Sequence, residues 1–387
     1  MSQRFFQNPE WMIGLIGMLM FPAFLSISPL HAQFTHVIID TTGPREPHCK
    51  AVGDIDGDGF IDILAASSTD NTEGIFWYRY PDWEKFNIHP GSFTTDMQVG
   101  DIDGDGDLDA IIPKGKWKGR SVWWYENPRP SADPAQGQWE EHFIGSANAH
   151  DMEVADLDDD GKPDVVVRED TLTIFFQHDP DTWRKFVPVV RLTEGTSLGD
   201  LDGDGDVDIV LNGVWLENPL PSGEPGTAPW LEHSYCASAP RQSGVHVADL
   251  NDDGRPDILV APSETARGRL VWYEAYDPKT SPWAEHLVDT AVSHAHTFKT
   301  GDMDDDGTPD IITAEMHQSP APHRVSIYYN VRGNGLEWNK QIVATTGSHN
   351  IRVGDIGDDG DLDIIGANWS NAAENGAPIE MWENRKR

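Results

Sequence analysis

One acidic loop recurs seven times along the chain, and its spacing constrains the fold more than any other feature. The first copy reads Asp54-Ile-Asp-Gly-Asp-Gly-Phe-Ile-Asp62. The first residues of successive copies are 47, 55, 44, 49, 53 and 53 residues apart, in or close to the range of β-propeller blades. Short β-type runs such as Ile63-Leu-Ala65 follow the loops. The sequence therefore predicts an all-β chain built from seven repeated units.

Each loop carries oxygen ligands at positions 1, 3, 5 and 9 around a glycine at position 6, and 26 of these 28 places are Asp. Hard oxygen ligands crowded on a tight turn suit calcium, and a cation is needed to neutralise so many carboxylates. The predicted calcium ligands are Asp54, Asp56, Asp58 and Asp62; Asp101, Asp103, Asp105 and Asp109; Asp156, Asp158, Asp160 and Asp164; Asp200, Asp202, Asp204 and Asp208; Asp249, Asn251, Asp253 and Asp257; Asp302, Asp304, Asp306 and Asp310; and Asp355, Asp359 and Asp363. Gly357 takes the third position of the last loop, so that site is expected to be the weakest.

An EF-hand begins with similar letters, but this interpretation fails. Position 12 of an EF-hand carries a bidentate Glu, whereas Ala65, Ile112 and Val167 stand there in the first three loops. The flanking segments are also β-type runs and not amphipathic helices. The loops therefore belong to a different calcium-binding repeat.

In motif and spacing the chain resembles the FG-GAP/VCBS repeat family, over nearly all of its length after the N-terminal segment. The resemblance implies a β-propeller with calcium in a strand-connecting loop. Some secreted propellers of this kind look like polysaccharide lyases or sugar dehydratases, including the propeller domain of aldos-2-ulose dehydratase-type enzymes. Others, in integrin ectodomains, serve adhesion.

The N-terminus has the pattern of a signal peptide. Arg4 precedes a mostly apolar stretch from Trp11 to Leu30, and cleavage is expected after Ala32. A retained membrane anchor is the competing interpretation. Residues 1–32 are thus a predicted signal peptide and residues 33–387 a predicted propeller, in a secreted or periplasmic protein without a membrane segment after cleavage.

Composition limits the partners. The net charge is −37, and seven calcium ions would still leave a strongly acidic surface, which argues against nucleic acid as a partner. Only Cys49 and Cys236 are present, so a disulfide scaffold is excluded, although a single bridge between them stays open.

The chain ends predict how the ring closes. Residues 34–39 look like the outer strand of a repeat but stand before the first acidic loop, and the chain ends without an outer strand after Trp382. We expect the N-terminal strand to complete the seventh blade, which would leave no large unpaired edge. All calcium loops are then expected on one face.

The residue six places before each loop should lie where the innermost strand begins, on the opposite face from the loops. The seven residues are His48, Thr95, His150, Glu194, Ser243, His296 and His349. Four are His, and they are expected to meet at the mouth of the central channel. A structural role for these histidines is the alternative.

This mouth is the predicted functional site. The candidate catalytic residues are His150, His296, His349, Arg168 and Lys114, with Glu169 at the edge. A second metal, of the zinc or manganese type, would be held by His294, His296, Glu315 and His317. In this prediction His294 and His296 share one side of a strand by alternation.

Two functions stay open from the sequence. The first is a carbohydrate-acting enzyme of lyase or dehydratase type, in which His is the base and a cation holds the developing enolate. The second is a non-catalytic propeller that binds a glycan or a protein. An enclosed pocket with perturbed pKa values would favour the enzyme.

Overall fold

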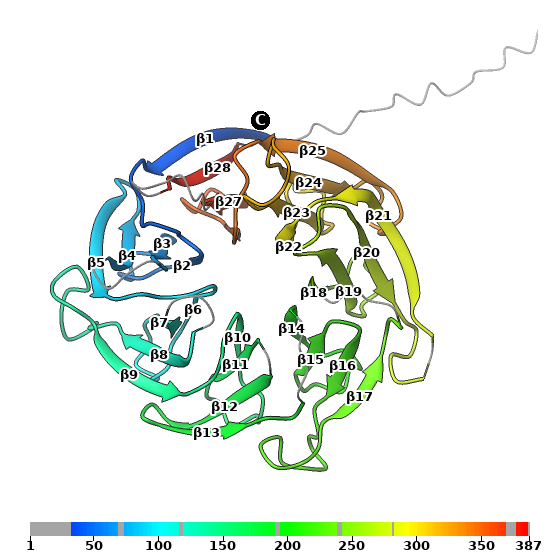
Figure 1. Cartoon of the computed structure of the whole chain (residues 1–387), viewed down its shortest axis with the longest axis horizontal. Helices are drawn as coiled ribbons and strands as arrows, with labels where there is room; N and C mark the ends of the chain where they lie inside the picture. Colours follow the sequence, from blue (N-terminus) through cyan, green and yellow to red (C-terminus); the bar gives the residue numbers. More distant parts are fainter. Residues whose placement is uncertain are drawn as a thin grey trace, which may run out of the picture. The chain divides into compact units, whose positions relative to one another are not determined.

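The computed structural model describes residues 32–68, 73–115, 119–169, 171–189, 194–237, 242–280, 282–368 and 377–385. Within these residues the structure contains 28 strands and no helix. The strands form seven four-stranded antiparallel sheets. The sheets follow one another in chain order around a common centre (Figure 1). The predicted all-β, seven-bladed propeller is confirmed.

The strands of the first three blades are β2(Cys49–Gly53), β3(Asp62–Ala66), β4(Gly74–Arg79) and β5(Glu84–Pro90); β6(Gln98–Gly100), β7(Asp109–Lys114), β8(Ser121–Glu126) and β9(Glu140–Gly145); and β10(Asp151–Ala155), β11(Asp164–Arg168), β12(Leu172–Asp179) and β13(Thr182–Phe186). Those of the next three are β14(Thr196–Gly199), β15(Asp208–Leu211), β16(Val214–Glu217) and β17(Leu231–Ser234); β18(Ser243–Ala248), β19(Asp257–Pro262), β20(Gly268–Glu274) and β21(Ala284–Val292); and β22(Ala295–Gly301), β23(Asp310–Glu315), β24(Val325–Asn330) and β25(Trp338–Ala344). The last blade consists of β26(Arg352–Gly354), β27(Asp363–Gly366), β28(Ile379–Arg385) and β1(Gln33–Asp40).

The first strand of each of these blades lies nearest the centre and contacts the first strands of the neighbouring blades. Each acidic loop joins this inner strand to the second strand, as Gly53 pairing with Asp62 across the first loop illustrates. The loop therefore lies at one end of the inner strand, and the residues that precede the strand lie at the other. This topology separates the acidic loops from the channel mouth.

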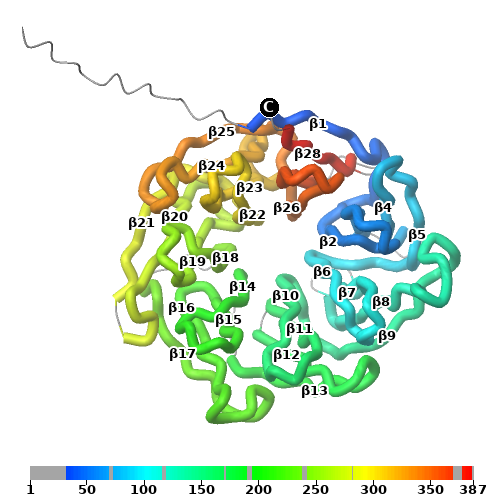
Figure 2. Tube along the Cα trace, turned by 180° about the vertical axis from the view of Figure 1, so that it is seen from behind, coloured from blue at the N-terminus to red at the C-terminus, as the bar shows by residue number. Residues whose placement is uncertain are grey.

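The seventh sheet contains strands from both ends of the described chain. Strand β1 is the outermost strand of this sheet and pairs antiparallel with β28, from Gln33 opposite Arg385 to Asp40 opposite Ile379. The two strands run side by side in both views of the ring (Figures 1 and 2). Residues 1–31, which include almost all of the predicted signal peptide, lie outside the described residues. The described part of the chain contains no helix that could cross a bilayer.

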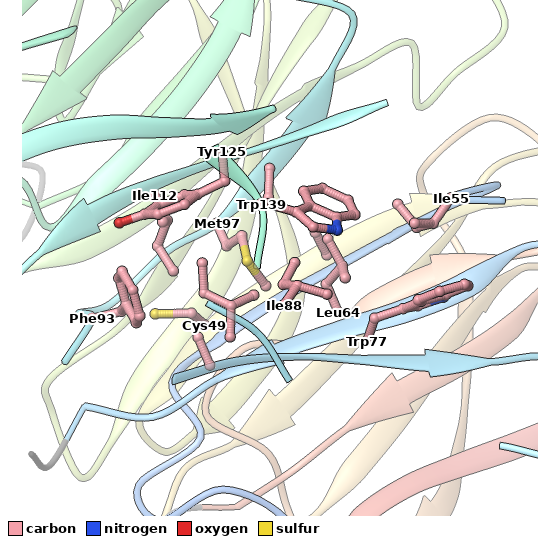
Figure 3. Packing of buried hydrophobic residues seen from close by; sticks show 14 residues of the cluster. Cys49, Ile55, Leu64, Trp77, Ile88, Phe93, Met97, Ile112, Tyr125 and Trp139 are labelled. Atoms are coloured by element: carbon pink, nitrogen blue, oxygen red, sulfur yellow. The ribbon is translucent and has the colours of Figure 1, made fainter. Parts of the chain in front are cut away.

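Large aromatic side chains fill the spaces between blades. Trp77 of the first blade and Trp139, which precedes β9 of the second, share one buried cluster with Leu64 and Met97 (Figure 3). The backbone N–H of Trp139 also donates to the carbonyl of Ile88 in the preceding blade, at 2.8 Å. These two Trp residues therefore pack between the first and second blades.

The histidines of the outer strands belong to the same framework. His142, His233 and His286 each stack on a Trp of the neighbouring strand, with ring centroids 4.2–4.3 Å apart. Each ring also bonds to a Glu at the end of that strand, as His233 does to Glu217 at 2.6 Å. These histidines are structural. Cys49 and Cys236 are both free, so the bridge left open by the sequence does not form.

Candidate functional site

The first residue of the acidic loop organises the turn. In the first loop the Asp54 carboxylate accepts the N–H groups of Gly57, Asp58 and Gly59 at 2.7, 3.1 and 3.0 Å. Gly57 and Gly59 have φ angles of 74° and 94°, in the left-handed region that favours glycine. The turn thereby directs the side chains of positions 1, 3 and 5 toward one point.

The carboxylate at position 9 holds the loop to its blade. In the second loop, Asp109 is buried and accepts the N–H of Ile102 at 2.9 Å with one oxygen and that of Asn127 at 2.9 Å with the other. Burial raises the pKa of Asp109 to about 8, and nearby carboxylates add to this shift. The Asn127 amide in turn donates to the carbonyl of Ile55 in the preceding acidic loop, at 2.9 Å. Neighbouring loops are therefore linked to each other.

The loop carboxylates converge as a cation site requires. Ligand oxygens lie within 4.8 Å of one another in three compact groups: Asp54, Asp56 and Asp58; Asp101, Asp103 and Asp109; and Asp156, Asp158 and Asp164. One oxygen of Asp158 is buried and makes no hydrogen bond within the described residues. An all-oxygen donor set with a buried, unsatisfied carboxylate oxygen fits calcium. These residues would supply the ligands that the sequence predicts.

Two loops differ from the others. In the fourth, the Lys279 ammonium lies 2.5 Å from Asp202 and 2.8 Å from Glu217. In the seventh, a Cβ at Gly357 would stand 3.1 Å from the Tyr80 hydroxyl, which occupies the space that an acidic side chain would need. The missing ligand of the seventh loop thus coincides with a tyrosine from the first blade.

At the opposite end of the inner strands, the structure brings together the four histidines that lie where these strands begin. The ring of His48 stacks on His349 at 4.3 Å, His349 lies 4.3 Å from His296, and His296 lies 5.4 Å from His150. They come from four different blades, so their proximity follows from the propeller and not from closeness in sequence. The prediction that these residues meet at the channel mouth agrees with this arrangement.

One of the four histidines is charged at neutral pH. Burial alone would lower the pKa of His150, but the Asp151 carboxylate, 2.9 Å from its Nδ1, outweighs burial and raises the pKa to about 10. Asp151 has its own pKa lowered to about 2: burial opposes this shift, but the His150 charge and the N–H of Gly195 at 2.8 Å prevail. His150 and Asp151 thus form a partly buried ion pair.

The other three histidines are neutral. Burial lowers the pKa of His48 to about 3 and that of His296 to about 4, and neighbouring cations add to both shifts. Burial also places the pKa of His349 well below its usual value. The mouth therefore holds neutral imidazoles beside one imidazolium, a combination that can accept a proton and stabilise a negative charge in the same place.

These histidines line a cavity of about 320 Å³. The remaining lining residues are Thr95, Glu169, Glu194, Gln242, Glu264, His317 and Gln318. No Lys or Arg is among the described residues that line it, so His150 is its one fixed cation there. Burial raises the pKa of Glu264 to about 7, and the nearby Glu194 contributes to the shift.

The structure does not place Arg168 and Lys114 in this cavity. Arg168 is fully buried inside its blade, where it donates to the carbonyl of Gly195. Lys114 turns outward, pairs with Glu141 and lies 4.8 Å over the ring of Trp123. Strand position alone could not show where these long side chains end, and neither supplies the positive charge expected of it at the mouth.

The predicted second metal site must also be revised. A β-bulge between Ala295 and Thr297 interrupts the pairing of β22 with β23, and His294 has a φ of 42°. His294 and His296 therefore do not alternate as in a regular strand. The Glu315 carboxylate is already engaged, because it accepts the N–H of Arg324 at 3.0 Å.

Of the four predicted ligands, His296 and His317 line the cavity, whereas His294 and Glu315 do not. The acidic residues that approach His296 are Glu194 and Glu264, with ligand atoms of the three residues all within 4.8 Å of one another. Glu194 was recognised at its repeat position but not as a site residue, and Glu264 was missed. The signal for Glu264 was its position seven residues after the last Asp of the loop, where His317 stands in the next repeat.

Comparison with protein families agrees with the repeats seen in the sequence. The model of the FG-GAP-like repeat matches residues 54–112, 249–313 and 302–366. Each matched segment contains two acidic loops and the strands that follow them. No curated protein matches the chain.

Proposed function

We propose that this chain, an FG-GAP-repeat β-propeller, binds calcium in its acidic loops and acts on a neutral carbohydrate at the mouth of its channel. The calcium part rests on the convergent carboxylates of the loops and on the buried, unbonded oxygen of Asp158. In this proposal calcium stabilises the scaffold, and the chemistry takes place at the other face.

The enzymatic part rests on one observation: a charged and a neutral imidazole line the same cavity. His150 has its pKa raised to about 10, whereas the pKa of His349 lies well below its usual value. Groups whose environments push their pKa values apart mark acid–base assignments in enzymes. A simple binding surface would not need this separation.

The lining favours a neutral substrate. Glu169 and Glu194 add negative charge, and the described lining contains no Lys or Arg to bind a uronate or a sulfated sugar. Gln242, Gln318 and Thr95 offer amides and a hydroxyl that match sugar hydroxyl groups. At about 320 Å³ the cavity is at the small end of ligand sites, which suits one or two sugar units.

The proposed reaction is elimination next to a sugar carbonyl. Neutral His349 takes the proton from the carbon beside the carbonyl, and the electron pair of the broken C–H bond forms the enolate. The imidazolium of His150 stabilises the enolate oxygen. The enolate then expels the β-hydroxyl group, which accepts a proton from a cavity acid and leaves as water, so that a double bond forms.

The test is a turnover assay on neutral glycans and keto-sugars, read at the absorbance of unsaturated carbonyl products. His150→Gln and His349→Ala should each lower kcat/KM at least about 100-fold, the range of one general acid or base. Their melting temperature in calcium should stay near that of the wild type. His233→Ala, in the outer Trp–His framework, is the matched control and should keep full activity.

If neutral glycans bind at the mouth without turnover, the non-catalytic glycan-binding function replaces the enzyme. If His233→Ala is as damaging as His349→Ala, the mouth histidines serve the fold alone. Secretion or export to the periplasm is proposed from the signal-peptide pattern of residues 1–32. A mature protein that does not begin near Gln33, by intact-mass measurement, would contradict it.

A further inference from the structure

The wall of the mouth cavity contains a compact group of three potential metal ligands from three consecutive blades. Glu194 precedes β14, Glu264 follows β19, and His296 lies in β22. Their ligand atoms all lie within 4.8 Å of one another. The Ser263 hydroxyl donates to Glu194 at 2.7 Å and fixes that carboxylate.

The spacing is close to that of a bound divalent ion. Nε2 of His296 lies 3.8 Å from a Glu264 oxygen. Ligands about 2.1 Å from a tetrahedral zinc ion are about 3.4 Å from one another. A shift of a few tenths of an ångström would therefore bring these two atoms into a coordination sphere.

A second, independent observation points to a ligand at this place. The His296 side chain is 7% exposed, and although the Asn350 side chain approaches the ring, neither ring nitrogen makes a hydrogen bond of good geometry within the described residues. Leaving buried polar atoms unpaired is costly, so an external partner is expected for this ring. The β-bulge next to His296 is of the kind that re-aims a side chain near a functional site.

A comparable cluster on the outer surface contains a histidine whose ring nitrogens are both bonded to protein side chains. Glu126, Glu140 and His142 are as close together as the three mouth residues. However, the two ring nitrogens of His142 bond to Glu126 and Asp181, each at 3.0 Å. The His142 ring also stacks on Trp124. Both ring nitrogens of His142 are thus hydrogen-bonded, whereas those of His296 make no bond of comparable geometry within the described residues.

We propose that Glu194, Glu264 and His296 bind one divalent transition-metal ion, of which zinc is the best match. Two carboxylates and one imidazole are a donor set that zinc accepts, and three protein ligands leave a position open for water or substrate. All three residues line the cavity. Only the further step, in which the ion polarises a substrate carbonyl, rests on the function proposed above.

Metal binding is measured directly, in the full-length protein with its acidic loops saturated with calcium. Zinc is titrated against a chromophoric chelator, and cobalt(II) is used as a spectroscopic probe of the site. The wild type should take up one zinc ion per chain that excess calcium does not displace. Cobalt(II) should give the intense visible absorption of a four- or five-coordinate site.

Two variants and one control decide the assignment. His296→Ala and Glu264→Gln should each weaken zinc binding at least about 100-fold, beyond the 10–100-fold usual for outer-sphere changes. Their calcium-dependent melting temperature should not change, which shows that they fold. His142→Ala, in the satisfied outer cluster, should bind zinc like the wild type.

The proposal is overturned if the wild type binds zinc no better than His296→Ala, or if His142→Ala removes the binding instead. Zinc binding without any sugar turnover would leave the metal site standing and refute the enzymatic function. Turnover that persists unchanged in zinc-free protein and in Glu264→Gln would refute the role of the ion in the reaction.

Discussion

The two kinds of carboxylate in an acidic loop should respond differently to calcium, and the second loop allows a direct comparison. Asp109 is 1% exposed and accepts two backbone N–H groups, each at 2.9 Å. Asp105 is exposed, and its contact with the backbone is one N–H from Asp107 at 3.2 Å. Both are predicted calcium ligands, but Asp109 also holds the loop in place.

Replacing each residue by Asn separates the two roles. In Asp109→Asn the new NH₂ group must face one of the two buried N–H donors and leaves it unpaired. An unpaired buried donor costs about 1–3 kcal/mol. In Asp105→Asn the amide oxygen can still accept the N–H of Asp107, so the backbone contact survives.

Denaturant unfolding with and without calcium measures the difference. In chelator at pH 6, below the pKa of about 8 that burial gives Asp109, the carboxyl is protonated and neutral in the folded wild type, so the substitution removes no charge and Asp109→Asn should lose about 1–3 kcal/mol. Under the same conditions Asp105→Asn should match or slightly exceed the wild type, since it removes one of several repelling charges. With calcium at 100 times its dissociation constant, Asp105→Asn should become less stable than the wild type by up to about 2.7 kcal/mol, the stabilisation that a bound ion supplies by mass action.

Two results would refute this reasoning. If Asp105→Asn is equally destabilised in chelator, the exposed carboxylates are part of the scaffold and not ligands. If it is unaffected in calcium, the loop holds no ion that matters to stability. Asp133→Asn, at an exposed loop outside the acidic repeats, controls for the effect of removing one surface charge.

Two further predictions concern ring closure and pH. Deleting residues 33–40, which form β1, should leave the outer edge of β28 unpaired and cause aggregation that size-exclusion chromatography detects; a stable monomer would contradict a closing role for this strand. Burial lowers the pKa of His48 to about 3, so between pH 6.5 and 3 this residue binds fewer protons in the folded than in the unfolded state. The free energy of unfolding therefore has its full value, as far as His48 is concerned, above pH 6.5 and falls as the pH drops through this window. At pH 5 this loss amounts to about 2 kcal/mol. Between pH 7.5 and 5 in saturating calcium, the unfolding free energy of the wild type should therefore fall by about 2 kcal/mol more than that of His48→Gln. Equal losses in denaturant unfolding would contradict the prediction.

The sequence predicted the features that depend on repeat register. Residues at one repeat position lie near one another around the axis, so the meeting of His48, His150, His296 and His349 followed from counting back from each loop. The outer strand missing from the last repeat likewise pointed to β1, which pairs with β28 in the structure. Both inferences need only the order of the strands.

Features that depend on side-chain direction or on irregular backbone could not be predicted in this way. Arg168 and Lys114 stand at the expected strand ends, but their long side chains find partners in Gly195 and Glu141, away from the cavity. The bulge at His296 breaks the alternation on which the first metal assignment relied. Glu264 lies beyond the end of β19, at the repeat position of His317, but the sequence does not show that its side chain turns into the cavity.

The separation of the two sites follows from the length of the inner strand. In the sixth blade, β22 runs from Ala295 to Gly301, with His296 near one end and the acidic residue Asp302 just beyond the other. Six residues in extended conformation span roughly 20 Å, about two Debye lengths at physiological salt. Charge in the acidic loops is therefore largely screened from the mouth, and calcium can influence the mouth mainly through the stability of the blade. This is why a variant of the mouth should leave calcium-dependent melting unchanged, and why zinc and calcium should be titratable independently in the same molecule.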